Sequence, residues 1–197
     1  MSTIIHFVRH SSYANPERLV PGRIPGYHLD HKGREKAKKT GSFFKNRPIN
    51  YIYSSPLERS YETANIIGEY LPKARVIHAY ELIELDSIHW QAYKLEELFI
   101  NNFYEAFLND QNTKEVPENL SKLATRLNNL TQKLCELHKG QELICVSHLY
   151  PIVVLRLLLE GKPLTMAKNY EVSSASITTF EFDKNCKFIR TEYTVPS

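Results

Sequence analysis

Short apolar runs alternate along the chain with longer segments in which apolar residues recur every three to four positions. The first pattern is typical of buried strands and the second of amphipathic helices. The apolar runs predict strands near residues 3–8, 50–54, 74–79 and 142–147. The longer pattern predicts helices near 31–46, 57–70, 93–108, 117–138 and 150–160. Because strands and helices alternate, we expect a three-layer α/β/α fold with a mainly parallel central sheet.

Two further β-rich runs, residues 177–182 and 187–193, stand near the end of the chain. The turn-forming residues 183–185 separate them, which predicts an antiparallel hairpin. We expect this hairpin at one edge of the sheet.

The predicted helix 117–138 has a leucine stripe with alternating steps of three and four residues. Its members are Leu120, Leu123, Leu127, Leu130, Leu134 and Leu137. The stripe is shorter than three heptads, so a helix packed on the sheet is favoured over a coiled coil.

Length and composition favour one domain over residues 1–197, with a formal net charge of only +3. The chain has no run of five or six basic residues, the pattern that would indicate a nucleic-acid partner. The three cysteines, Cys135, Cys145 and Cys186, show no CxxC spacing, and an odd number predicts reduced thiols in a cytoplasmic protein. No signal peptide is visible, and the most apolar segment, 152–159, is too short to span a membrane, which takes roughly 20 residues.

Two histidines directly follow predicted strands. His10 stands after Arg9 at the end of the first strand, and His148 follows the strand 142–147. In open α/β sheets, ligands bind beyond the carboxyl ends of the strands. We therefore expect both imidazoles to lie at a ligand site.

Two arginines indicate that this ligand is a phosphate. Arg9 follows the first strand, and Arg59 opens the helix after the second, with Pro56 suited to a first helical turn. Guanidinium groups bind phosphate oxygens in bidentate fashion. They also lower the pKa of a neighbouring imidazole and so favour its neutral, nucleophilic form, which makes His10 the candidate nucleophile. His148 is a candidate donor to phosphoryl oxygens.

Other chemistries find less support. The chain has no GxGxxG, GxxxxGK or HExxH motif, and its histidines lack zinc-ligand spacing, so we expect no cofactor and no metal. Glu81, Glu84 and Asp86, after the third strand, are three candidate general acids for a leaving alkoxide, and their spacing does not choose among them.

Five sequence elements occur in order along the chain. They are Val8-Arg9-His10-Ser11; Gly22-Arg23-Ile24-Pro25-Gly26-Tyr27-His28-Leu29 with Gly33 and Ala37; Ser54-Ser55-Pro56-Leu57-Glu58-Arg59 with Thr63-Ala64; Glu84 with Trp90-Gln91 and residues 95–98; and Val146-Ser147-His148 with Ile152 and Leu155. In this order they resemble the broad-specificity phosphatase branch of the histidine phosphatase superfamily, also called phosphoglycerate mutase-like. The resemblance covers roughly residues 4–161.

This resemblance implies a phosphoglycerate mutase-like fold and a phosphomonoester phosphatase that needs no metal. It implies that His10 becomes a phosphohistidine and that Glu84 is the general acid. Arg9, Arg59 and His148 would surround the phosphoryl group. Arg23 is a further candidate substrate contact.

The chain departs from the family pattern at several positions. Ser11, Ile88, Ala92 and Leu149 stand where the family has glycine, which permits positive φ or close backbone approach. Tyr13 replaces a Ser or Thr, and the family's asparagine falls on Pro16, with Asn15 adjacent as a substitute. We expect Ser11 to be tolerated, and Leu149 and Ile88 to reshape the pocket.

Three functions remain open from the sequence. The leading hypothesis is a phosphatase acting on a small phosphorylated metabolite. The runner-up is a cofactor-dependent mutase, although mutases of this pattern have longer chains. The third is a non-catalytic phospholigand-binding module. The sequence names no particular phosphomonoester and leaves the oligomeric state open, a homodimer included.

Overall fold

The computed structural model describes residues 1–87, 90–94, 96–97 and 118–197. Its strands are β1 (Thr3–Arg9), β2 (Ile49–Ser54), β3 (Arg75–His78), β4 (Glu142–Ser147), β5 (Ile177–Phe182) and β6 (Phe188–Thr194). They form a six-stranded sheet in the order β3-β2-β4-β1-β5-β6. The first four are parallel, whereas β5 and β6 form an antiparallel hairpin at one edge. Both the mainly parallel sheet and the edge hairpin are confirmed.

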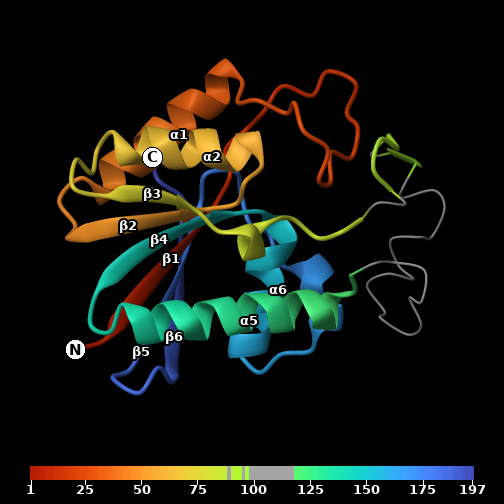
Figure 1. The fold of residues 1–197 in the computed structure, drawn as a ribbon. Coiled ribbons are helices and arrows are strands. Elements are labelled where there is room, and N and C mark those ends of the chain that lie inside the picture. Colours follow the sequence, from red (N-terminus) through yellow and green to blue (C-terminus); the bar gives the residue numbers. More distant parts are fainter. Residues whose placement is uncertain (88–89, 95, 98–117) are drawn as a thin grey trace.

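Helices cover both faces of this sheet. They are α1 (His31–Phe44), α2 (Glu58–Gly68), α5 (Leu120–Leu137) and α6 (Leu149–Leu159), with short 3-10 helices η1 (Tyr80–Leu82) and η2 (Leu164–Asn169). Figure 1 shows α1 and α2 on one face and α5 and α6 on the other, as the predicted three-layer fold requires. The predicted helix at 93–108 lies largely outside the described residues.

The leucine stripe of α5 faces the sheet. Leu120, Leu123, Leu127, Leu130 and Leu134 are buried in the core between α5, α6 and the sheet, and Leu137 at the end of the helix is 63% exposed. The prediction of a helix packed on the sheet is confirmed. Among the described residues, no helix is both long and apolar enough to cross a membrane.

Strand register brings the predicted site residues together. Arg9 at the end of β1 is level with Ser147 at the end of β4, and Val146 is level with Ser54 at the end of β2. Because these strands are parallel, the residues that follow them meet at the same edge of the sheet.

The cysteine prediction needs a correction. Cys135 of α5 and Cys186 of the β5–β6 turn form a disulfide, with their Cα atoms 5.9 Å apart. The expectation of three reduced thiols is therefore wrong for this pair. The turn folds back against α5, so the fold joins two cysteines that stand 51 positions apart. Cys145 of β4 is a free, buried thiol whose pKa is raised by burial.

Candidate active site

A cavity of about 270 Å³ lies at the carboxyl edge of the sheet. Four of the predicted site residues line it: Arg9, His10, Arg59 and Glu84. The other described lining residues are Tyr13, Val20, Pro21, Gly22, Leu85, Ser87, Trp90, Leu149 and Tyr150. His148 is buried and is not among the described lining residues, but its ring centroid lies 5.0 Å from that of His10.

The backbone fixes which nitrogen of His10 can react. Nδ1 of His10 lies 2.8 Å from the backbone carbonyl oxygen of Ser11. A carbonyl only accepts, so Nδ1 carries the proton and Nε2 keeps its lone pair. Burial, Arg59 and Arg9 hold the pKa of His10 well below its usual value. The ring is therefore neutral at neutral pH, in the form that can act as a nucleophile.

The backbone after His10 is held from both sides. Ser11 Oγ donates to the carbonyl of Gly33 over 2.7 Å, and the Ser11 amide donates to Thr63 Oγ1 over 3.0 Å. Gly33 approaches so closely that a Cβ there would lie 1.9 Å from the carbonyl oxygen of Ser12. Serine at position 11 is thus accommodated by hydrogen bonds, as the sequence led us to expect.

Both arginines present unpaired nitrogens. Arg59 is 1% exposed; its Nη2 donates to the carbonyl of Gly22 over 2.7 Å. Arg9 Nη1 donates to the carbonyl of Val172 over 2.6 Å. Within the described part of the chain, Nε and Nη1 of Arg59 and Nε of Arg9 have no hydrogen-bond partner. Buried donors of this kind are costly without an acceptor, so an anion bound here would satisfy them.

His148 is oriented by two serines. It precedes the first residue of α6, and its Nε2 lies 2.7 Å from Ser55 Oγ and 3.2 Å from Ser60 Oγ. Ser55 Oγ also accepts from the amide of Leu57, and its hydroxyl hydrogen is available to Nε2 of His148 when the imidazole proton is on Nδ1. With Nε2 accepting, the neutral ring carries its proton on the buried Nδ1, which has no partner among the described residues. The pKa of His148 is well below its usual value because of burial, Arg59 and His10.

Glu84 is the candidate acid that geometry favours. Of the three carboxylates considered from the sequence, it is the one that lines the cavity; Glu81 is exposed and Asp86 pairs with Arg23. Burial raises the pKa of Glu84, although the Leu85 amide, which donates to its Oε1 over 2.8 Å, and the charges of Arg59 and Arg9 lower it. A carboxyl with a raised pKa suits a general acid.

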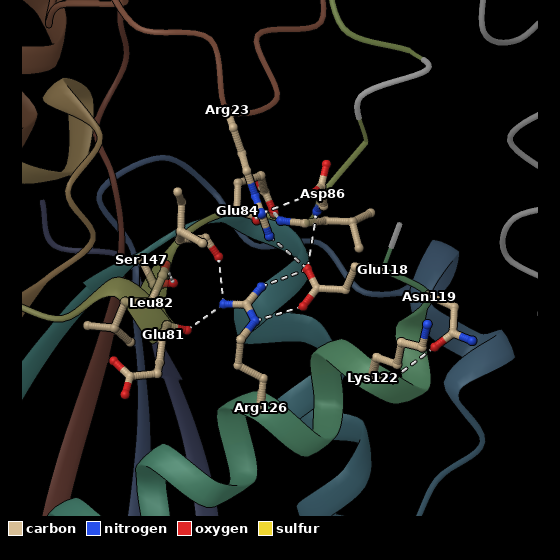
Figure 2. A network of polar contacts seen from close by, with 12 residues as sticks. Arg23, Glu81, Leu82, Glu84, Asp86, Glu118, Asn119, Lys122, Arg126 and Ser147 are labelled. Carbon is tan, nitrogen blue, oxygen red and sulfur yellow. Dashed lines mark hydrogen bonds and ion pairs between the residues drawn. The ribbon is translucent and has the colours of Figure 1, made fainter. Parts of the chain in front are cut away.

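Arg23 lies outside the cavity lining and contacts the backbone behind the acid. Its Nε donates to the carbonyl of Glu84 over 2.9 Å. Its two terminal nitrogens reach Asp86 Oδ2 and Glu118 Oε2, each over 3.0 Å (Figure 2). The guanidinium is thus engaged by the protein, and its predicted contact with substrate stays a prediction.

Sequence reasoning missed Arg126 and Glu118, which complete this contact network. Arg126 donates to both oxygens of Glu118 over 2.7 and 2.8 Å, and to the carbonyls of Glu81 and Ile83 (Figure 2). Glu118 also accepts from the Asp86 amide over 3.1 Å. Burial alone would raise the pKa of Glu118, but Arg126 and Arg23 hold it below its usual value. We call Arg23, Glu118 and Arg126 the acid clamp, because together they fix the backbone that carries Glu84.

No periodicity or motif in the sequence links the members of the acid clamp to Glu84. Glu118 and Arg126 stand 34 and 42 positions beyond it along the chain.

Among the described residues, no group of three or more His, Cys, Asp or Glu side chains is placed to hold a metal ion.

A comparison with known families shows which family the chain belongs to. The profile described as "Histidine phosphatase superfamily (branch 1)" matches residues 5–193. The chain belongs to this superfamily. The predicted family is therefore confirmed, and with it the phosphomonoester phosphatase as the class of enzyme.

Relatives of this histidine phosphatase cover most of its length. Phosphoglycerate mutase-like protein 4 of Arabidopsis thaliana is 28% identical over 88% of this chain and 76% of its own. Phosphoserine phosphatase 1 of Hydrogenobacter thermophilus is 26% identical over 90% and 85%. The structure of phosphoserine phosphatase from Entamoeba histolytica, in complex with 3-phosphoglyceric acid, matches with a TM-score of 0.84 at 23% identity, over 98% of this chain and 96% of that one. This last likeness confirms the phosphoglycerate mutase-like fold.

The structure shows the surroundings of several residues that depart from the superfamily pattern. Ala92 has φ of +68°, a conformation that favours glycine, at one of the family's glycine positions. Leu149 lies in the first turn of α6, and its side chain lines the cavity, as does Tyr13. Asn15 bonds both backbone groups of Leu19, so it closes a turn of the loop. Ile88 lies outside the described residues.

Proposed function

We propose that this histidine phosphatase hydrolyses phosphomonoesters through a phosphohistidine on His10. The observation that carries the proposal is a set of four buried nitrogens around His10 without partners in the described protein. They are Nε of Arg9, Nε and Nη1 of Arg59, and Nδ1 of His148. A phosphoryl group offers the oxygens that satisfy such donors, and charge builds on those oxygens in the transition state.

In the first step, Nε2 of His10 attacks the phosphorus, and the bond from phosphorus to the ester oxygen breaks. Glu84 gives its proton to that oxygen, so the alcohol leaves neutral. Arg9, Arg59 and His148 hold the phosphoryl oxygens throughout the transfer.

In the second step, the Glu84 carboxylate takes a proton from a water molecule as the water attacks the phosphohistidine. The bond between nitrogen and phosphorus breaks, inorganic phosphate leaves, and His10 is neutral again. Each proton in this cycle is held by a residue of the chain, and we propose that no metal or cofactor takes part.

The proposed substrate is a small phosphorylated metabolite. The relatives named as phosphoserine phosphatases support this scale of substrate. A single domain over 1–197, a cytoplasmic location and a homodimer remain predictions.

Release of inorganic phosphate from a panel of phosphomonoesters, with EDTA present, tests the proposal. We expect release by the wild-type protein and none by His10→Ala. Equal release by both would overturn the phosphohistidine mechanism. Conversion of a primed phosphoester to its isomer without phosphate release would identify a mutase, and binding without either reaction a phospholigand-binding module.

A further inference from the structure

The wall of the cavity beyond the phosphoryl site is apolar. Tyr13, Val20, Leu85, Trp90, Leu149 and Tyr150 form most of it. Apart from the two tyrosines, the described lining residues with ionisable side chains are those of the proposed chemistry: Arg9, His10, Arg59 and Glu84. The part of a substrate that lies beyond the phosphoryl group therefore meets carbon atoms and aromatic rings.

The position of Glu84 shows where the leaving alcohol must lie. A second hollow, of about 470 Å³, shares Arg9, Leu149 and Tyr150 with the cavity and is lined further by Lys168. Glu84 lines the cavity and is absent from the lining of the second hollow. The acid must reach the ester oxygen within hydrogen-bond distance, so the alcohol attached to that oxygen lies in the apolar cavity.

Charge in the cavity disfavours an anionic alcohol. In the proposed mechanism, the phosphoryl oxygens take the unpaired nitrogens of Arg9 and Arg59. A carboxylate on the alcohol would lose its hydration here, and no described residue lining this cavity offers a further cation to pair with it, which is unfavourable. An apolar alcohol gains from the same surroundings, because its surface leaves water.

Two residues that depart from the family pattern supply part of this apolar wall. Leu149 adds a branched side chain where the pattern has glycine, and Tyr13 adds a ring where it has Ser or Thr. The Tyr13 ring lies 5.6 Å from the Arg59 guanidinium and 5.4 Å from the His10 ring, so it borders the phosphoryl site itself.

We propose that this protein prefers phosphomonoesters of small, uncharged apolar alcohols, and that Leu149 and Tyr13 determine the preference. The inference rests on the proposed phosphatase function. The cavity of about 270 Å³ is slightly smaller than typical ligand pockets, which range over roughly 300–1,000 Å³. It suits one aromatic ring or a short aliphatic chain.

The test compares kcat/KM for benzyl phosphate and butyl phosphate with kcat/KM for O-phosphoserine and 3-phosphoglycerate. All four are primary alkyl phosphates without an activated leaving group, so large differences report the fit of the alcohol. We expect the two apolar esters to be favoured at least tenfold. A preference for either charged ester would overturn the inference.

Two cavity variants test which residues determine the preference for apolar alcohols. Leu149→Ala and Tyr13→Ser should each reduce the ratio of benzyl phosphate to O-phosphoserine by about tenfold, mainly through a higher KM for benzyl phosphate. Leu158→Ala is the matched control, because Leu158 lies on the same helix, is 42% exposed and should leave the ratio unchanged. An unchanged ratio in both cavity variants would overturn the assignment.

Two further outcomes separate the failures. If Lys168→Ala removed a strong activity on 3-phosphoglycerate, the alcohol would lie in the second hollow, which overturns the inference and keeps the phosphatase. If the wild-type protein hydrolysed no ester, p-nitrophenyl phosphate included, the proposed function and the inference would both be wrong.

Discussion

Nδ1 of His10 donates to the backbone carbonyl of Ser11 over 2.8 Å. This single bond leaves Nε2 of the imidazole unprotonated, and it ties the direction of the ring to the path of the backbone. That path in turn depends on Gly33, whose carbonyl accepts from Ser11 Oγ. The reactivity of the proposed nucleophile therefore depends on how closely helix α1 approaches the loop after β1.

Replacing Gly33 by alanine should impair both stability and catalysis. The new Cβ would lie 1.9 Å from the backbone oxygen of Ser12, so the loop must move. We expect a loss of about 1–3 kcal/mol in the free energy of unfolding and a fall in kcat of at least tenfold. Chemical denaturation and steady-state kinetics measure the two effects. Gly68→Ala is the control, since its Cβ would lie 3.5 Å from the Val76 side chain, an ordinary contact. Similar effects in both variants would contradict this explanation.

Removing the Arg59 guanidinium should weaken transition-state binding. Arg59→Ala deletes two of the four unpaired nitrogens around His10. We expect kcat/KM to fall by an amount equivalent to about 2–4 kcal/mol, the scale of one lost anion-stabilising donor. Arg47→Ala, which alters an ion pair with Glu142 outside the cavity lining, should keep wild-type kinetics. Retention of full activity by Arg59→Ala would exclude it from the phosphoryl site.

Loss of the Glu84 proton should slow esters with strongly basic leaving groups more than esters with weakly basic ones. Glu84→Gln cannot donate a proton, so we expect about 10²-fold slower turnover of benzyl phosphate and a much smaller loss for p-nitrophenyl phosphate. Because the pKa of Glu84 is raised, the carboxyl stays protonated to a higher pH than a free glutamic acid. The rate with benzyl phosphate should fall as pH rises through that pKa, and this decline should vanish in Glu84→Gln. Equal slowing of both esters would contradict the role as acid.

The low pKa of His10 determines how far activity extends into acid solution. A neutral imidazole is required for attack, and its pKa lies well below its usual value, so activity should persist into acid solution. A profile of kcat/KM that fell as pH dropped through an ordinary histidine pKa would contradict a buried, arginine-flanked nucleophile.

The acid clamp should matter through the position of Glu84. Glu118→Gln weakens the links to Arg126 and Arg23 that hold the backbone around the acid. We expect kcat for benzyl phosphate to fall about tenfold, because small displacements of a catalytic group are costly, with little change for p-nitrophenyl phosphate. Glu142→Gln is the control. Glu142 is similarly buried and also pairs with an arginine, but it lies at the start of β4, at the end of the strand away from the active site. Equal losses with both esters in Glu118→Gln would indicate a structural role only.

The sequence could predict the centre of this site because its residues stand at the ends of strands. A strand pattern that runs into His10 or His148 places the imidazole at the carboxyl edge, and parallel pairing does the rest. Arg59 could be found for the same reason, since it opens the helix that follows β2.

The sequence could not predict the contacts that depend on side chains meeting from distant segments. Arg126 bonds the backbone carbonyl of Ile83 and Glu118 accepts from the Asp86 amide, on either side of Glu84, and no periodic spacing in the sequence links them to Glu84. Arg23 lies in a recognisable motif, yet its partners Asp86 and Glu118 come from other segments, so its direction was not visible. The pairing of Cys135 with Cys186 likewise follows from how the β5–β6 turn folds back.

The phosphohistidine itself is the most direct measurement. The protein is mixed with a good phosphomonoester substrate, quenched with alkali within the first turnover, and the phosphorylated peptide is mapped by mass spectrometry. We expect one phosphoryl group on His10, stable in alkali and lost in acid, and none in His10→Ala. A phosphoryl group on another residue, or one that forms equally in His10→Ala, would contradict it.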